Sequence, residues 1–179
     1  MRRALSLMVL SALLVQISFA KDRVTAPEGF AWQEIPELKT AFLIPTNWFF
    51  KRNELHGHPA YYISKENIDT DGQFRTGLTV IVYFKKKSVV EYAEKYIDKL
   101  ATQYHGEKWA KEVGSLKEFG LQSKHAYPDG TGVDRALMVA NPKTNTLYLI
   151  LFESPEPDWD VAWKTGATIV DNLVFDDEI

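Results

Sequence analysis

Two segments of the chain are apolar on both faces of the strand they would form, rather than at alternate positions only. They are residues 78–84 and 147–152. Successive side chains of a strand point to opposite faces of a sheet, so a strand that is apolar throughout is covered on both faces. We therefore predict that both segments are strands in the middle of a sheet. A strand at 61–64 and a polar loop at 67–77, rich in Asn, Asp and Gly, precede the first of them.

A longer segment, residues 88–104, has the periodicity of an amphipathic helix. Ser88 and Glu91 match a capping box at its start, because the hydroxyl and the carboxylate are spaced to bond each other's backbone amides. Gly106 follows its end, where a left-handed residue is favoured. The apolar positions recur every three or four residues: Val89, Ala93, Tyr96, Ile97, Leu100 and Tyr104.

A second helix is predicted after residues 154–158, whose prolines and acidic side chains suit a helix start. Trp159 and Trp163 lie on its apolar stripe. We interpret them as core residues, and a stacking platform for a ligand is the alternative.

The remaining elements complete an antiparallel pattern. Residues 51–59 and 127–132 read as a loop and a turn. The order strands, helix, strands, helix, with short hairpins between neighbouring strands, predicts an α/β/α sandwich, an α+β fold in which helices flank a central, mostly antiparallel sheet. The other strands are predicted at 31–35, 40–44, 108–114, 116–127, 135–140 and 173–175.

The first twenty residues have the three regions of a secretory signal peptide. Arg2 and Arg3 are positive, residues 4–17 are apolar, and Ser18 and Ala20 are the small residues that signal peptidase reads. The apolar run is shorter than the ~20 residues that a membrane span needs, although a retained anchor is the alternative. We predict cleavage after Ala20 and export to the periplasm or the outside of the cell, with no transmembrane segment after cleavage.

The rest of the chain fits one domain. Residues 21–30 are predicted to be a flexible leader, and residues 31–179 a single globular domain. The formal net charge of −3 disfavours nucleic acid, whose recognition needs a basic surface. The chain has no Cys, which excludes disulfides, thiolate metal sites and a Cys nucleophile.

Two histidines form a weak candidate metal site. His56 and His58 flank a glycine, and His105, His125 or a carboxylate would have to complete a zinc or copper site. Two ligands do not specify a site, so two solvated histidines are the competing interpretation.

The loop at 67–77 is a candidate interaction loop, through Asn67, Asp69, Asp71 and Arg75. Its start resembles half of a calcium loop, but Leu78 occupies the position of the bidentate Glu. A turn stabilised by its Asn and Asp side chains is the competing interpretation.

No catalytic pattern stands out. No serine lies in a Gly-x-Ser-x-Gly elbow, and no glycine-rich phosphate loop precedes a helix. We therefore predict no enzyme activity and no cofactor.

Several framework segments resemble the PsbP-like superfamily, over about residues 30–175. The resemblance implies an α/β/α sandwich and a role as an adaptor or assembly factor, as in the extrinsic lumenal subunits of photosystem II and a Ran-GTPase-binding nuclear factor. It assigns no functional residue. The matching segments are 42–45 with Trp48, 62–68, 76–80, 153–157 with Trp159 and Trp163, and 169–175.

The sequence thus predicts an exported, non-catalytic binding or assembly-factor module acting on a protein or small-molecule partner. A small metal- or ligand-binding periplasmic protein is the alternative. A hydrolase with an unrecognised site is the third hypothesis, to be revived by a cleft that joins a Ser or a carboxylate pair to a histidine.

Overall fold

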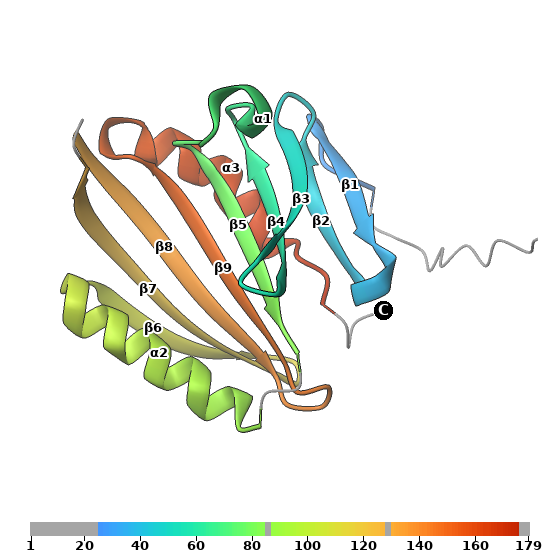
Figure 1. The fold of residues 1–179 in the computed structure, drawn as a ribbon, viewed down its shortest axis with the longest axis vertical. Coiled ribbons are helices and arrows are strands. Elements are labelled where there is room, and N and C mark those ends of the chain that lie inside the picture. Colours follow the sequence, from blue (N-terminus) through green and yellow to red (C-terminus); the bar gives the residue numbers. More distant parts are fainter. Residues whose placement is uncertain (1–24, 85–86, 128–129, 176–179) are drawn as a thin grey trace, which may run out of the picture.

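The computed structural model describes residues 25–84, 87–127 and 130–175 (Figure 1). The predicted signal peptide, the first part of the predicted leader, Lys85, Lys86 and the acidic end at 176–179 lie outside the described residues. In the described part of the predicted leader, the amide of Phe30 donates to the carbonyl of Pro27 at 3.0 Å. Within the described ranges, none of the helices has the length and apolar character needed to cross a bilayer.

Seven antiparallel strands form the main sheet, in the order β3-β4-β5-β9-β8-β7-β6. They are β3 (Phe49–Leu55), β4 (His58–Ser64), β5 (Gly77–Tyr83), β6 (Glu107–Val113), β7 (Leu116–Tyr127), β8 (Gly130–Asn141) and β9 (Thr146–Pro155). A separate two-stranded sheet pairs β1 (Phe30–Ile35) with β2 (Thr40–Pro45). The helices are α1 (Ile68–Asp71), α2 (Val89–Tyr104) and α3 (Trp159–Asp171), with one-turn 3-10 helices at Pro36–Leu38 and Glu156–Asp158.

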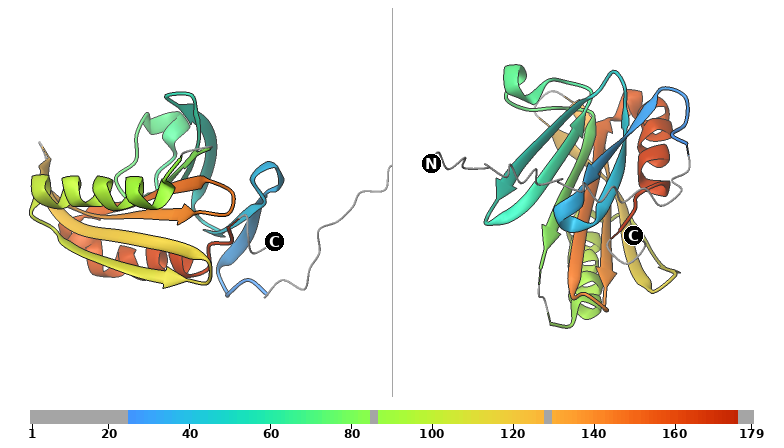
Figure 2. Two further views of the ribbon diagram at one scale, coloured as in Figure 1. Left: turned by 90° about the horizontal axis from the view of Figure 1, so that it is seen from below. Right: turned by 90° about the vertical axis from the view of Figure 1, so that its right-hand side faces the viewer.

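The two strands that are apolar on both faces lie in the middle of the sheet, as predicted, and the structure places them side by side. β5 pairs with β9, and both have neighbours on their other edges. In β9, Ile150 faces the cluster that contains α3 residues, whereas Leu149 and Leu151 face α2. Figure 2 shows α2 and α3 on opposite faces of the sheet. The fold is therefore α+β, with a large antiparallel sheet and a helix on each face.

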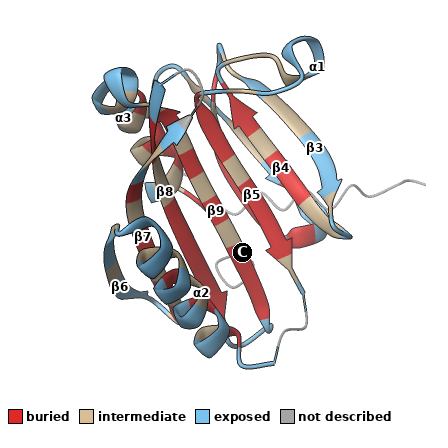
Figure 3. Cartoon of the chain, turned by 60° about the vertical axis from the view of Figure 1, so that its left-hand side comes forward, coloured by how far each residue is buried: buried red, intermediate tan, exposed pale blue. Residues whose placement is uncertain are grey.

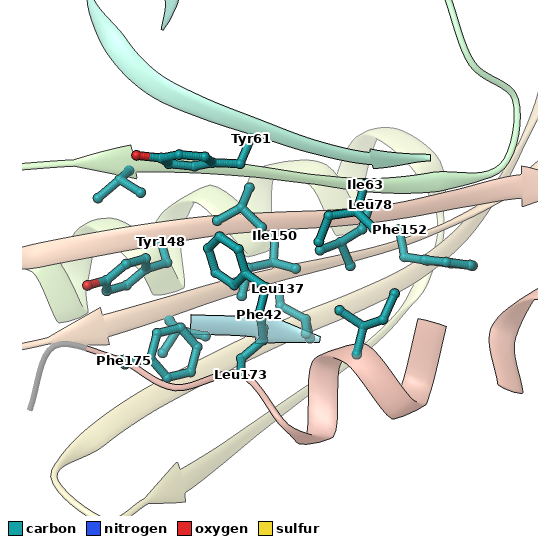
Figure 4. Close-up of a cluster of buried hydrophobic side chains, with 14 of the residues drawn as sticks. Phe42, Tyr61, Ile63, Leu78, Leu137, Tyr148, Ile150, Phe152, Leu173 and Phe175 are labelled. Atoms are coloured by element: carbon teal, nitrogen blue, oxygen red, sulfur yellow. The ribbon is translucent and has the colours of Figure 1, made fainter. Parts of the chain in front are cut away.

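The larger core lies on the α3 face, where the side chains labelled in Figure 4 meet. Phe152 of β9 is 1% exposed and packs edge-on against Trp159 and Trp163, whose rings stack on each other at 5.6 Å. Both tryptophans are partly buried against this core, which confirms the core interpretation. Leu173 and Phe175 close the cluster beyond α3, where Val174 forms a single bridge to Ala41.

The predicted loop at 51–59 is wrong, because this segment belongs to a hairpin. β3 and β4 pair from Phe49 with Ser64 to Leu55 with His58. His56 and Gly57 form the two-residue turn with φ of 52° and 79°, the positive values that favoured hairpin turns require. β3 is an edge strand with mostly exposed or half-buried residues (Figure 3), so its sequence lacks the apolar alternation of a core strand.

The predicted helix at 88–104 is confirmed as α2, but the capping box is wrong. Ser88 has a φ of 56°, and its side chain makes no capping hydrogen bond. Glu91 instead accepts from Lys95, one turn further along α2, at 2.6 Å. The loop at 67–77 contains one short helix, α1, whose N-cap is Asn67.

Candidate functional site

A cavity of about 400 Å³ lies between the C-terminal half of α2 and the sheet. We call it the α2 cavity. This volume lies within the range of small-molecule sites in proteins, and such sites combine apolar walls with a few polar groups. Its lining follows that pattern: Tyr96, Leu100, Tyr104, Leu121, Ser123, His125, Ala126, Asp134, Ala136, Leu149 and Leu151.

Asp134, which lines the α2 cavity, lies next to a second carboxyl group, that of Glu153. Asp134 of β8 pairs directly with Ser123 of β7 on one side and with Glu153 of β9 on the other. Residues paired in this way have Cβ atoms about 5 Å apart on one face of the sheet. Gly77 pairs with Glu153 on its other side, and the ring of Phe74 occupies the space where a side chain of residue 77 would stand.

Burial changes the protonation of both acids. It raises the pKa of Asp134 from 3.8 to about 7, because the ionised carboxylate loses its hydration. The pKa of Glu153 is likewise raised from 4.5 to about 7, chiefly by burial and also by the nearby charges of Asp134 and Glu66. Near neutral pH this pair therefore holds protons that ordinary carboxylates release.

His125 contacts Asp134 but does not offset the negative charge of the acid pair. The Nε2 atom of His125 lies 2.9 Å from Oδ2 of Asp134. Burial lowers the pKa of His125, so the imidazole is uncharged near neutral pH and the contact is a hydrogen bond rather than an ion pair. The other oxygen of Asp134, Oδ1, is buried without a hydrogen-bond partner among the described residues.

A second cavity, of about 650 Å³, lies on the other side of Glu153. β3, β4 and the α1 loop form its walls, with Tyr62 and Phe74 in edge contact at 6.2 Å. The loop is tied down by Glu66, whose Oε2 accepts from the amides of Arg75 and Thr76, each at 3.1 Å. The acid pair thus stands between two cavities on the face of the sheet that carries α2.

The residues predicted for an interaction loop lie beside this second cavity. Asn67 caps α1 by accepting from the amide of Asp69, and Asp69 also forms an ion pair with Lys51 of β3. Asp71 accepts from the hydroxyl of Thr70. All of these contacts are local to the loop or to β3, and a role for Asn67, Asp69, Asp71 and Arg75 in partner binding stays a prediction.

The candidate metal ligands lie apart from the acid pair. His56 is exposed in the β3–β4 turn, and the ring of His58 packs 4.5 Å from that of Tyr83. The described residues contain no group of three His, Asp or Glu side chains arranged to hold a metal. The metal hypothesis for His56 and His58 therefore stays a prediction, without a third ligand in that part of the chain.

Sequence reasoning missed the acid pair. Asp134 falls just before the strand predicted at 135–140, and Glu153 falls just after the strand predicted at 147–152. A signal was present at Glu153, because an acidic residue continues the row of Leu149 and Leu151 on one face of a buried strand. Its pairing with Asp134 depends on the register of β8 and β9, which the sequence does not state.

Comparisons with known proteins give matches only at the level of structure. No family model and no curated protein sequence matches the chain. The solution structure of cyanobacterial PsbP (CyanoP) from Synechocystis sp. PCC 6803 aligns with a TM-score of 0.58 and 11% identity, over 88% of this chain and 98% of that one. The crystal structure of LpqN, involved in cell envelope biogenesis of Mycobacterium tuberculosis, aligns with a TM-score of 0.53 and 9% identity, over 76% of this chain and 82% of that one.

At these identities the likeness concerns the fold. The aligned parts include most of both chains in each comparison. The resemblance predicted from the framework segments is therefore confirmed at that level: the chain has a PsbP-like fold.

Proposed function

We propose that this protein is an exported, non-catalytic binding module whose ligand occupies the α2 cavity. The observation that carries the proposal is Oδ1 of Asp134, a buried acceptor without a partner among the described residues, at the wall of a cavity large enough for a small molecule. Buried polar groups nearly always have a hydrogen-bond partner, so a bound molecule is expected to supply the missing donor.

Two further observations support this assignment. LpqN, whose solved structure aligns with this chain, is involved in cell envelope biogenesis, which agrees with the export predicted from residues 1–20. Helices on opposite faces of one sheet also fit the α/β/α sandwich expected of a PsbP-like adaptor, which offers a rigid scaffold for binding.

Native mass spectrometry of the protein purified from its own host tests the proposal. Leu100 reaches the α2 cavity from the helix, so Leu100→Trp should fill the space without disturbing the strands. Lys99→Trp places the same ring on the exposed face of α2 and is the matched control. We expect a small bound mass on the wild type and on the control, and its loss from Leu100→Trp. A bound mass that survives Leu100→Trp would contradict the proposal.

A hydrolase is the second candidate, because the α2 cavity brings Ser123, His125 and Asp134 together. This is the cleft that the third hypothesis required. Ser123 is only 8% exposed and lies within a regular strand, however, whereas serine nucleophiles usually stand on sharp, accessible turns. Hydrolysis of small activated esters that disappears in Ser123→Ala but persists in Ser115→Ala would establish this activity, and equal rates for both variants would exclude it.

A further inference from the structure

We infer that the α2 cavity takes an organic ammonium compound, whose cationic nitrogen lies between Asp134 and Glu153 and whose apolar stem lies under α2. This inference deepens the proposed function and rests on it. It concerns the chemical class of the ligand, which neither solved relative indicates for this cavity.

The charge of the cavity walls selects a cation. Asp134 and Glu153 are adjacent across β8 and β9, and no lysine or arginine lines the α2 cavity among the described residues. An ammonium group donates hydrogen bonds to both carboxylates, and its single positive charge offsets one of their two negative charges, whereas a neutral alcohol has one donor and no charge. An anionic ligand would meet two acids of its own sign and is disfavoured.

The nearby charged groups leave this preference intact. Lys51 reaches the second cavity but is paired with Asp69, and Glu66 is held by two backbone amides. From α2, the facing titratable groups are Tyr96 and Tyr104; burial raises the pKa of Tyr96, so this phenol stays uncharged. From β7, His125 stays uncharged because its pKa is lowered.

The remaining walls suit the rest of such a ligand. The rings of Tyr104 and His125 lie 5.8 Å apart at the acid end, and tyrosine faces attract organic cations. Leu100, Leu121 and Leu149 supply an apolar surface further along the α2 cavity. An ammonium with an alkyl stem of a few carbons therefore satisfies the acid pair and removes its apolar part from water.

This geometry couples binding to proton release. In the free protein at pH 7, two carboxyls with pKa values of about 7 hold about one proton between them. A bound ammonium favours the ionised form of both, so binding should release about one proton at pH 7. A neutral ligand bound at the same place should not release this proton, because it does not favour the ionised carboxylates.

Isothermal titration calorimetry with hexylamine, hexanol and hexanoate tests the inference. Titrations at pH 7 in two buffers that differ in ionisation enthalpy measure the protons released. We expect hexylamine to bind at least about tenfold more tightly than hexanol, with proton release, since charge-assisted hydrogen bonds are about twice as strong as neutral ones. Hexanoate should not bind.

Variants locate the effect at the acid pair. Asp134→Asn with Glu153→Gln should weaken hexylamine binding at least about tenfold and abolish proton release. Glu94→Gln removes one charge from the exposed face of α2 and should change the affinity less than about twofold, because exposed charges are screened. The release of protons is measured on the wild type alone. The inference can therefore be tested even if the double variant does not fold.

Three outcomes would overturn the inference. Equal affinity for hexanol and hexylamine would show a cavity without preference for a cation, and equal affinity of the double variant would place the amine elsewhere. No binding of hexylamine at millimolar concentrations would reject the class of ligand. None of these outcomes changes the result of the Leu100→Trp experiment, so the proposed function stands or fails separately.

Discussion

Replacing Asp134 by asparagine should stabilise the protein most above neutral pH, and the gain should shrink as the pH falls toward the pKa of the free side chain. The asparagine carbonyl can still accept the hydrogen bond from His125, so the substitution chiefly removes the buried charge. In the wild type the burial of this carboxylate is costly whenever it is ionised. The effect of the variant therefore depends on pH, unlike the effect of a packing defect.

The sign and the size follow from the pKa of Asp134, which is 3.8 for the free side chain and about 7 in the folded protein. Between these two values the folded state holds a proton that the unfolded state has lost, so stability falls as pH rises through this window and levels off above pH 7. At 1.36 kcal/mol per pH unit the upper limit is about 4 kcal/mol. Because 16% of the side chain is exposed and water screens its charge, we expect about 1–2 kcal/mol.

Urea denaturation at about pH 5 and about pH 8.5, on either side of the folded-state pKa, measures the difference. The wild type should lose stability between the two conditions, and Asp134→Asn should lose about 1–2 kcal/mol less. Glu94→Gln on the exposed face of α2 is the control and should follow the wild type. A wild type and an Asp134→Asn variant with parallel pH profiles would refute the reasoning, because they would show that Asp134 is ionised at little cost in the folded state.

Three further predictions concern packing and the α1 loop. Gly120→Ala should destabilise the protein by about 1–3 kcal/mol in urea denaturation, because the new Cβ would overlap the ring of Trp109, and adding Trp109→Ala should relieve that overlap. Phe152→Ala should cost about 3–5 kcal/mol in the same assay, since this ring is almost fully buried; a loss below about 1 kcal/mol would contradict the core described above. Glu66→Ala should speed hydrogen exchange at the amide of Thr76 without a comparable change in α3, and unchanged exchange there would show that this bond does not hold the loop.

The sequence predicted the middle of the sheet better than its edges. β5 and β9 could be predicted because strands covered on both faces are apolar at every position. β3 could not, because an edge strand exposed on much of its surface resembles a polar loop. The turn between β3 and β4 uses His56 before Gly57, where Asn or Asp is the usual signal. The prediction of a capping box at Ser88 was wrong for a related reason. A capping box requires an extended residue before the helix, and Ser88 has a left-handed conformation.

The candidate site was hidden for a different reason. A sequence pattern indicates a possible site only where the residues are close along the chain, as His56 and His58 are. Asp134 and Glu153 lie on separate strands, and only the register of β8 against β9 makes them neighbours. Their perturbed protonation arises chiefly from burial, which depends on how the surrounding elements pack rather than on either residue alone.

The bridge between β2 and the end of the chain has a consequence for the order in which the protein assembles. Ala41 and Val174 exchange two backbone hydrogen bonds, of 3.1 and 3.0 Å, so a strand made early is fixed by a segment made last. Closing so long a loop costs chain entropy, which favours contacts between nearby segments first. During synthesis the bridge that fixes β2 therefore waits for Val174, and a chain truncated before residue 173 is expected to hold its first two strands less firmly.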